Sequence, residues 1–81
     1  MNTEKHIKIT GYSNISWKDA IVKAIESAGK SLEHLSMCEV ICQRARIANG
    51  KIIEYIVDLD ISFFIDPQIN SDQNSQDADN M

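Results

Sequence analysis

The chain has 81 residues, of which 12 are Asp or Glu and 8 are Lys or Arg, giving a formal net charge of −4. This length fits one domain. A domain of this size buries only about 60–65% of its unfolded surface, so association between copies would help to stabilise it. The charge argues against a nucleic-acid partner, because phosphate binding needs clustered basic side chains and only Arg44 and Arg46 lie close together.

The sequence also predicts a cytoplasmic protein without a membrane segment. No apolar stretch reaches the roughly 18 residues of a membrane span, and the polar start MNTEKH is unlike a signal peptide. Cys38 and Cys42 are expected on one face of one strand about 13 Å apart, whereas a disulfide needs Cα atoms within about 7 Å. We interpret them as buried free thiols of a reducing compartment.

The first predicted elements are a short strand at residues 5–10, ended by Gly11, and an amphipathic helix. Ser16 followed by Asp19 resembles a capping box, and Ser13 is an alternative cap one turn earlier. The helix is predicted because apolar residues recur at three- and four-residue spacing: Trp17, Ala20, Ile21, Ala24, Ile25, Ala28, Leu32 and Leu35.

A long hairpin follows, with arms at residues 37–47 and 51–65 joined by Asn49-Gly50, the strongest short-range signal for a tight turn. One alternate set of the second arm is apolar and is expected to face the helix: Tyr55, Val57, Leu59, Ile61, Phe63 and Ile65. The other set is mixed: Glu54, Ile56, Asp58, Asp60, Ser62 and Phe64. In the first arm, Val40 and Cys42 share one face, and Met37, Glu39, Ile41 and Gln43 share the other. Since one helix covers one face, the second face should meet something else.

Together these elements predict an α+β protein with the order β-α-β-β and a three-stranded antiparallel sheet. The composition changes at Asp66, after which Asp, Asn, Gln and Ser dominate. Such a segment cannot bury enough apolar surface to offset the entropy of ordering it. We therefore predict a domain at residues 1–66 and a disordered acidic polar tail at residues 67–81, with a partner-binding role of the tail as an alternative.

Few residues offer site chemistry by themselves. His6 and His34 lie in different elements and have no ligand spacing with the cysteines, so a zinc site is not predicted, and a Cys–His nucleophilic pair has no support. Asp58 and Asp60 share a strand face and could hold a hard cation such as Ca²⁺ between subunits, or form a solvated acidic strip. Trp17 is interpreted as a packing anchor. No catalytic motif appears, so the chain is not predicted to be an enzyme.

Two segments resemble the dodecin family. In KITGYSNISWKDAIVKAIESAGKSLEHL the matching positions are Gly11, Ser13, Ser16, Trp17 and Ala20. In EVICQRARIANGKIIEYIVDLDISFF they are Glu39, Val40, Arg44, Gly50, Tyr55, Val57 and Phe63. The resemblance covers about residues 5–66 and rests on order, spacing and length together. It implies a sheet that partly wraps one helix, and twelve copies assembled as a homododecameric hollow shell.

The resemblance further implies storage or sequestration of flavins (FMN, riboflavin or lumichrome) between subunits. Met37 stands where flavin-binding dodecins have a tryptophan that stacks on the ring, and Ile56 where they have a glutamine that bonds its polar edge. Arg44 keeps a basic position that can meet an FMN phosphate. We therefore predict a small flat ligand at Met37, Arg44 and Ile56, with flavin affinity weak or lost. The alternatives are a flavin-free structural shell, a divalent cation at Asp58 and Asp60, or a phosphate-bearing coenzyme at Arg44.

Overall fold

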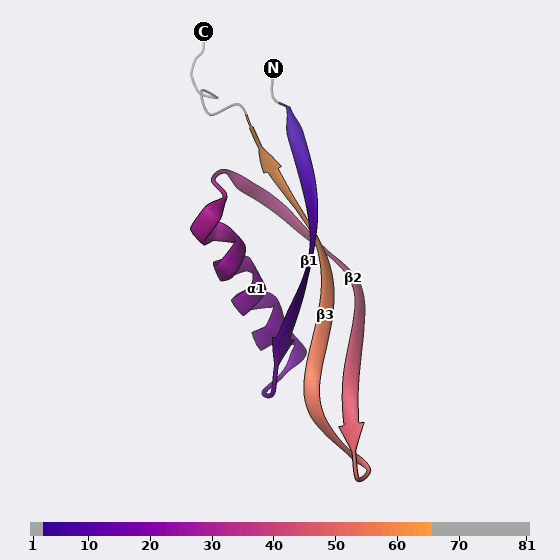
Figure 1. Cartoon of the computed structure of the whole chain (residues 1–81). Helices are drawn as coiled ribbons and strands as arrows, with labels where there is room; N and C mark the ends of the chain where they lie inside the picture. The colour runs from indigo at the N-terminus through magenta and orange to yellow at the C-terminus, as the bar shows by residue number, and fades with distance from the viewer. Residues whose placement is uncertain (1–2, 66–81) are drawn as a thin grey trace, which may run out of the picture.

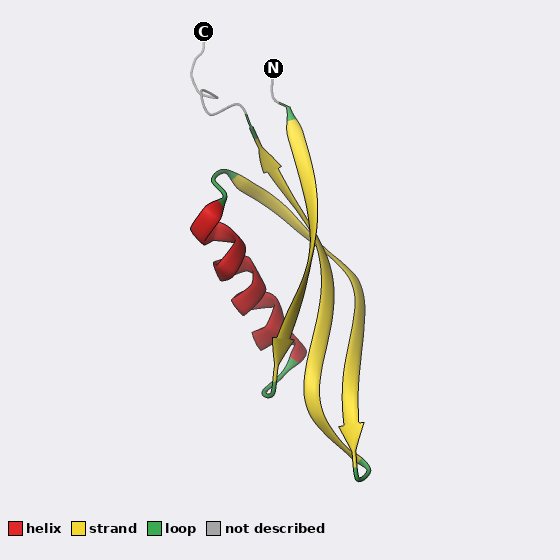
Figure 2. Ribbon diagram, viewed as in Figure 1, coloured by secondary structure: helices red, strands yellow, loops and turns green. Residues whose placement is uncertain are grey.

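The computed structural model describes residues 3–65 as one helix and three strands (Figure 1). The elements are β1 (Glu4–Ser13), α1 (Trp17–Ser31), β2 (Leu35–Ala48) and β3 (Lys51–Phe64). The strands form one antiparallel sheet in the order β1-β3-β2, and α1 covers one of its faces (Figure 2). The predicted α+β class and the β-α-β-β order are confirmed. The predicted tail at residues 67–81 lies outside the described residues.

The start of α1 uses both candidate capping serines in different ways. Ser16 is the cap, since its side-chain oxygen accepts from the backbone N–H of Asp19 at 2.9 Å. Ser13 supports the preceding turn, because its hydroxyl accepts from the N–H of Ile15 at 2.9 Å and donates to Oδ2 of Asp19 at 2.6 Å. The bond from Ser13, followed by the contact with Lys23, lowers the pKa of Asp19. The helix therefore begins with its first orphan N–H groups partly satisfied.

The end of α1 comes earlier than the apolar stripe predicted. Leu32 already has extended backbone angles (φ −124°, ψ 144°), and Leu35 is the first residue of β2. Between them His34 adopts the left-handed region with φ 62°, and its carbonyl accepts from the N–H of Phe64 at 3.1 Å. Leu35 still packs against the core. Its apolar role was thus predicted correctly, but its placement in the helix was wrong.

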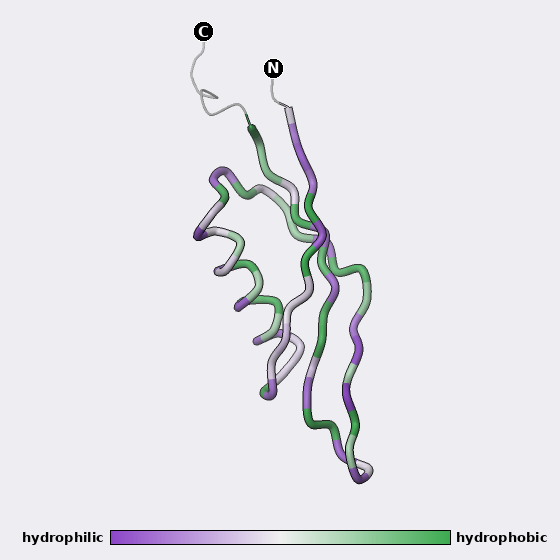
Figure 3. The backbone as a smooth tube through the Cα atoms, in the orientation of Figure 1, coloured by the Kyte–Doolittle hydropathy of each residue, from purple (hydrophilic) through white to green (hydrophobic). Residues whose placement is uncertain are grey.

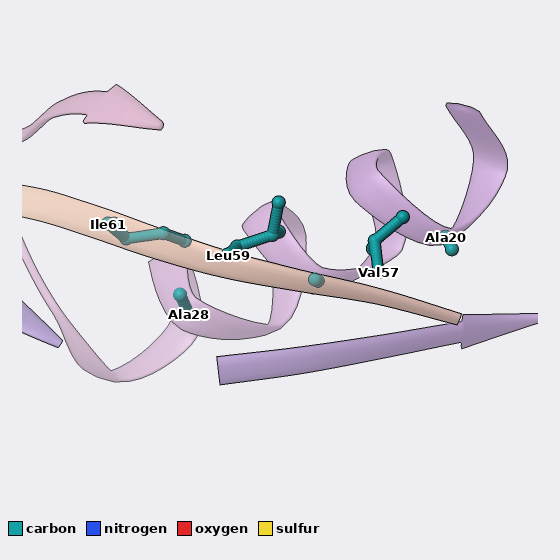
Figure 4. Packing of buried hydrophobic residues seen from close by; sticks show 6 residues of the cluster. Ala20, Ala28, Val57, Leu59 and Ile61 are labelled. Atoms are coloured by element: carbon teal, nitrogen blue, oxygen red, sulfur yellow. The ribbon is translucent and has the colours of Figure 1, made fainter. Parts of the chain in front are cut away.

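The core lies between α1 and β3 (Figure 4). Three small residues of the helix, Ala20, Ala24 and Ala28, pack against Val57, Leu59 and Ile61 of the central strand. The three strand residues are at most 1% exposed. They belong to the alternate set that was predicted to face the helix, and that prediction is confirmed. Alanine side chains allow the helix backbone to approach the sheet closely, so the larger strand residues fill the interface.

Gly11 lies within β1 and does not end it, because the strand continues to Ser13. The prediction of a strand break at this glycine is therefore wrong. A Cβ atom on Gly11 would lie 2.6 Å from the carbonyl oxygen of Ala20 and 2.9 Å from Cβ of Ala24. The absence of a side chain thus lets β1 pass directly against the helix backbone.

The predicted hairpin between β2 and β3 is confirmed. Asn49 and Gly50 have φ values of 53° and 75°, both positive, as a two-residue turn of type I′ requires. The hairpin extends past the start of α1 and past the end of β1, so the helix does not cover its tip (Figure 1). Apolar segments nevertheless recur along both arms in this part (Figure 3).

A β-bulge in β2 reverses part of the predicted alternation. Ile41 is left unpaired between Val40 and Cys42, where the register against β3 shifts. One extra residue exchanges the faces of the side chains that follow. Cys42 consequently lies on the face away from the helix and Gln43 on the helix side, so both face predictions are wrong. Cys38 and Cys42 therefore occupy opposite faces of the sheet, and Cys42 is exposed.

Candidate functional site

The side of the sheet turned away from α1 is termed the open face. It is formed by the mixed set of β3 together with its register partners in β1 and β2. These residues are Glu54, Ile56, Asp58, Asp60, Ser62 and Phe64 in β3, Glu4, His6, Lys8, Thr10 and Tyr12 in β1, and Met37, Glu39, Cys42, Arg44 and Arg46 in β2. All three residues predicted to bind a flat ligand, Met37, Arg44 and Ile56, lie on this face.

Ile56 occupies the centre of one row of the open face, between Tyr12 and Arg44. Its side chain is only 6% exposed, whereas Tyr12 is 52% exposed and the Arg44 side chain 55%. The row therefore presents an aromatic ring and a guanidinium on either side of a covered apolar residue. Since isoleucine has no hydrogen-bonding group, polar recognition in this row depends on Tyr12 and Arg44.

The start of α1 fixes the strand that carries Arg44. Trp17 donates its indole N–H to the backbone carbonyl of Arg44, with the two atoms 2.8 Å apart. The indole also meets the ring of Tyr55 edge to face, with centroids 4.8 Å apart and an interplanar angle of 77°. Both contacts agree with the interpretation of Trp17 as a packing anchor. They hold β2 in place from the side of the sheet that faces the helix.

The next row is centred on Asp58, whose carboxylate collects donors from both neighbouring strands. Oδ1 accepts from the hydroxyl of Thr10 at 2.9 Å and from Nη2 of Arg44 at 3.1 Å. Oδ2 accepts from the thiol of Cys42 at 2.9 Å. Arg44 stands opposite Ile56 in the register, so its guanidinium is directed along the strand toward Asp58.

These contacts determine the charge states in the row. Hydrogen bonds from Cys42, Thr10 and Arg44 lower the pKa of Asp58, with the thiol bond as the largest cause. The bond to Asp58 in turn raises the pKa of Arg44 and is the largest cause of the raised pKa of Cys42. Asp58 and Arg44 are thus charged at neutral pH and Cys42 is a neutral thiol, which is a poor nucleophile. Within residues 3–65 neither cysteine is hydrogen-bonded to a histidine.

Farther along the sheet, His6 lies among acidic and hydroxyl groups. Its Nδ1 is 3.0 Å from Oδ2 of Asp60 and 3.3 Å from the hydroxyl of Ser62, and its Nε2 is 3.6 Å from Oε1 of Glu4. Asp60 and the Ser62 hydroxyl both lie against Nδ1, so the ring cannot pass a proton between these two groups from one nitrogen to the other, as a catalytic relay does. The hydrogen bond with Asp60 is the largest cause of the raised pKa of His6. Oδ1 of Asp60 is buried and has no hydrogen-bond partner.

The two aspartates predicted as cation ligands lie in separate rows. Asp58 is surrounded by donors, and Asp60 uses one oxygen for His6. In the part of the chain that the structure describes, no three His, Cys, Asp or Glu side chains gather in a way that could hold a metal ion. A cation at Asp58 and Asp60 therefore stays a prediction that would require ligands from further copies of the chain.

Met37 lies far from the other two predicted ligand residues. It is 65% exposed and stands opposite Ser62, which lies six residues after Ile56 in β3. At about 3.3 Å per strand residue, this separation is roughly 20 Å. Met37 also borders an apolar pocket of about 210 Å³ at the junction of α1 and β2, lined by Ile25, Leu35, Ser36, Met37, Cys38 and Ile61. One chain therefore brings Arg44 and Ile56 together but not Met37.

This architecture defines a small β-α-β-β protein with one covered and one open sheet face. A family model described as Dodecin matches residues 3–66. The chain therefore belongs to the dodecin family, and is a dodecin-like small binding protein. No protein in a comparison with curated proteins matches the chain. Among residues 3–65, no helix combines the length and the hydropathy that crossing a membrane requires.

Solved structures support the same assignment. A protein from Thermus thermophilus is 29% identical with a TM-score of 0.78, and the match covers 84% of this chain and 100% of that chain. The dodecin from Streptomyces davaonensis is 28% identical with a TM-score of 0.77, covering 80% and 96%. A protein from Mycobacterium tuberculosis described as a calcium dodecin with a novel calcium-binding site is 33% identical with a TM-score of 0.70, covering 82% and 94%.

The contacts that Asp58 makes with Arg44, Thr10 and Cys42 were not predicted from the sequence. A uniform alternation in β2 places Arg44 on the same face as Val40, toward the helix. The bulge at Ile41 reverses that assignment. The available signal was the opposite charge of Arg44 and Asp58, but their pairing depends on a register that no local pattern determines.

Proposed function

We propose that the chain forms a homododecameric shell that binds small flat ligands, flavins among them, between its open faces. Its role would be storage or sequestration in the cytoplasm rather than catalysis. Family membership supports this proposal, and so does the arrangement of the open face. The homododecamer would supply the second layer that the sheet lacks within one chain.

The observation that carries the proposal is the separation of the three ligand positions. Arg44 and Ile56 are direct register partners, while Met37 lies roughly 20 Å away along the sheet, at ~3.3 Å per residue. A flat ligand that contacts all three positions must therefore lie between copies. Assembly and ligand binding are in this way two parts of the same proposal.

The hairpin tip supplies apolar surface for such an assembly. Ile47, Ile52 and Ile53 are 65%, 46% and 48% exposed. They lie beside the turn of the hairpin, whose tip extends past the start of α1 (Figure 1). A group of exposed aliphatic side chains on a projecting element is typical of a protein–protein interface.

Met37 and Ile56 are both expected to lower the affinity for flavins. Met37 can contact an aromatic ring through its sulfur, which contributes about 0.3–1.5 kcal/mol. Ile56 leaves the polar edge of an isoalloxazine ring unpaired, at a cost of about 1–3 kcal/mol for each buried group. Together these differences would weaken flavin binding by about two orders of magnitude relative to a site with tryptophan and glutamine there.

Size-exclusion chromatography with light scattering tests the assembly. The expected particle has a mass near twelve times 9.1 kDa. Ile47→Asp places a charge on the hairpin tip and should yield smaller species. Val22→Asp, which changes a 43% exposed residue of α1, serves as the matched control and should leave the particle intact. A monomeric or dimeric parent chain would refute the assembly.

Titration of flavin fluorescence tests the ligand. The parent protein should quench FMN, riboflavin and lumichrome only weakly at micromolar concentrations. The double variant Met37→Trp/Ile56→Gln should bind at least one of them about a hundredfold more tightly, because both ring contacts return. A double variant that does not gain affinity would contradict the flavin assignment. Mass spectrometry of small molecules released from the native particle would then identify the resident ligand.

A divalent cation is the second candidate ligand. A structurally similar protein is described as a calcium dodecin. In this chain Oδ1 of Asp60 is a buried carboxylate oxygen with no hydrogen-bond partner. Calorimetric titration with Ca²⁺ should release heat with the parent protein and not with Asp60→Asn. The absence of both heat and thermal stabilisation in the parent would remove this candidate.

A further inference from the structure

The guanidinium of Arg44 is already occupied within the chain. Nη2 donates to Oδ1 of Asp58 at 3.1 Å, although the register partner of Arg44 is Ile56. The carboxylate is itself held in place from both sides, by the hydroxyl of Thr10 at 2.9 Å and by the thiol of Cys42 at 2.9 Å. Asp58 thus forms a fixed anchor that directs Arg44 away from the row of Ile56.

This anchor places a permanent negative charge beside the only cation of the Ile56 row. The hydrogen bonds from Cys42, Thr10 and Arg44 lower the pKa of Asp58, so the carboxylate is ionised at neutral pH. A phosphate that approached Arg44 would meet this carboxylate at close range. To bind, the phosphate would have to share the guanidinium of Arg44 with Asp58 or displace Asp58 from it.

The second arginine of the open face is paired in the same manner. Nε of Arg46 donates to Oε1 of Glu54 at 2.9 Å. Both arginines of the chain therefore have a carboxylate partner. A neutral planar ligand meets no such competition, because the exposed ring of Tyr12 offers it an uncharged contact in the Ile56 row.

We propose that Asp58 determines ligand specificity on the open face by holding Arg44, so that neutral planar ligands are favoured over their phosphate-bearing counterparts. This inference rests on the proposed ligand-binding function. It opposes the alternative of a phosphate-bearing coenzyme held by Arg44. Asp58 acts through Arg44 and is therefore a positioning residue for the site.

The ratio of affinities for riboflavin and FMN tests the proposal, because the two share one ring system and differ by a phosphate. The parent protein should bind riboflavin at least as tightly as FMN. Asp58→Asn should shift the ratio toward FMN by about fivefold, the scale of one exposed ion pair. The matched control is Glu39→Gln, which removes one negative charge from the same face in another row than Arg44, and should change the ratio less than about twofold. An unchanged ratio in Asp58→Asn, or an equal shift in both variants, would overturn the proposal.

A second measurement tests, without any flavin, whether Asp58 keeps anions from Arg44. Phenylglyoxal modification of Arg44 is quantified by peptide mass spectrometry with and without inorganic pyrophosphate, and Arg46 is the internal reference. Pyrophosphate should protect Arg44 in Asp58→Asn and not in the parent. Equal protection of Arg44 in both proteins would refute the role of Asp58. If no flavin binds any variant, the flavin assignment fails, while this measurement still decides whether Asp58 keeps anions from Arg44.

Discussion

The two faces of the sheet use the same central strand in opposite ways. On the helix side, Val57, Leu59 and Ile61 are at most 1% exposed and pack against α1. On the open face, Asp58 and Asp60, which alternate with them, hold polar and charged neighbours. The covered face is complete within one chain, whereas the open face is not. Stability of the single chain therefore depends on one side of β3, and recognition is expected on the other.

The polar groups of the open face are largely paired with each other. Arg44 contacts Asp58, Arg46 contacts Glu54, and His6 contacts Asp60. Exposed ion pairs contribute little to folding stability. Their effect is to limit which charges an incoming surface or ligand can satisfy. This difference between the faces leads to three predictions, in which a helix-side change alters folding and an open-face change alters association or pH response.

The largest effect is expected from Leu59→Ala. This substitution removes a side chain with no exposed surface from the centre of the core. The free energy of unfolding should fall by about 2–5 kcal/mol, because the cavity adds to the lost hydrophobic burial. Denaturant unfolding followed by Trp17 fluorescence measures this change.

Ile41→Ala is the matched comparison for Leu59→Ala. Ile41 is the bulge residue of β2 and is 50% exposed. Its effect should depend on protein concentration, because the side chain would be covered only on assembly, while the effect of Leu59→Ala should persist at every concentration. A concentration-independent loss of equal size in both variants would contradict the distinction between the core and a surface that only assembly covers.

Gly11→Ala should have an intermediate effect on the helix side. The added Cβ would lie 2.6 Å from the carbonyl oxygen of Ala20, which is a backbone atom and cannot rotate away. We expect a loss of about 1–3 kcal/mol from the displaced helix. Gly29→Ala is the control, since the nearest atom to its Cβ would be a Leu35 side-chain carbon at 3.8 Å. This control should stabilise α1 by up to about 1 kcal/mol. Thermal unfolding of both variants tests the prediction, and equal losses would contradict it.

The smallest effect is expected from His6 on the open face. Its pKa is raised above the ordinary value of 6.5 by Asp60 and Glu4. The protonated form is therefore favoured in the folded chain. Its stabilising contribution is fully present below pH 6.5 and is lost as the pH rises through the higher pKa of the folded state. His6→Gln should therefore reduce the dependence of folding stability on pH in this range.

His34→Gln is the control for the pH profile, because His34 lies 3.7 Å from the exposed side chain of Glu33 and outside the open face. Stability measured from pH 5 to 9 at constant ionic strength should keep the parent slope in this variant. Proton NMR of the two imidazole rings gives the direction of the His6 shift directly. A His6 ring that titrates below its ordinary value would contradict the prediction.

Local patterns were sufficient for most of the fold. The cap at Ser16, the turn at Asn49-Gly50 and the helix-facing set of Val57, Leu59 and Ile61 could all be predicted, because each depends on neighbouring residues or on a simple period. The motifs around Gly11 and Tyr55 were also sufficient to identify the family, which the match over residues 3–66 confirms. The sequence by itself therefore determined the element order, the covered face and the family.

Only the tertiary structure decided what the open face contains. The bulge at Ile41 places Cys42 and Arg44 beside Asp58, and Gly11 proves to be a contact point for α1 instead of a strand end. Both features depend on residues far apart in the chain, and a register shift of one residue exchanges the faces of a whole strand segment. For that reason the open-face placement of Met37 and Ile56 could be predicted, but the position of Arg44 beside Asp58 and the ion pair between them could not.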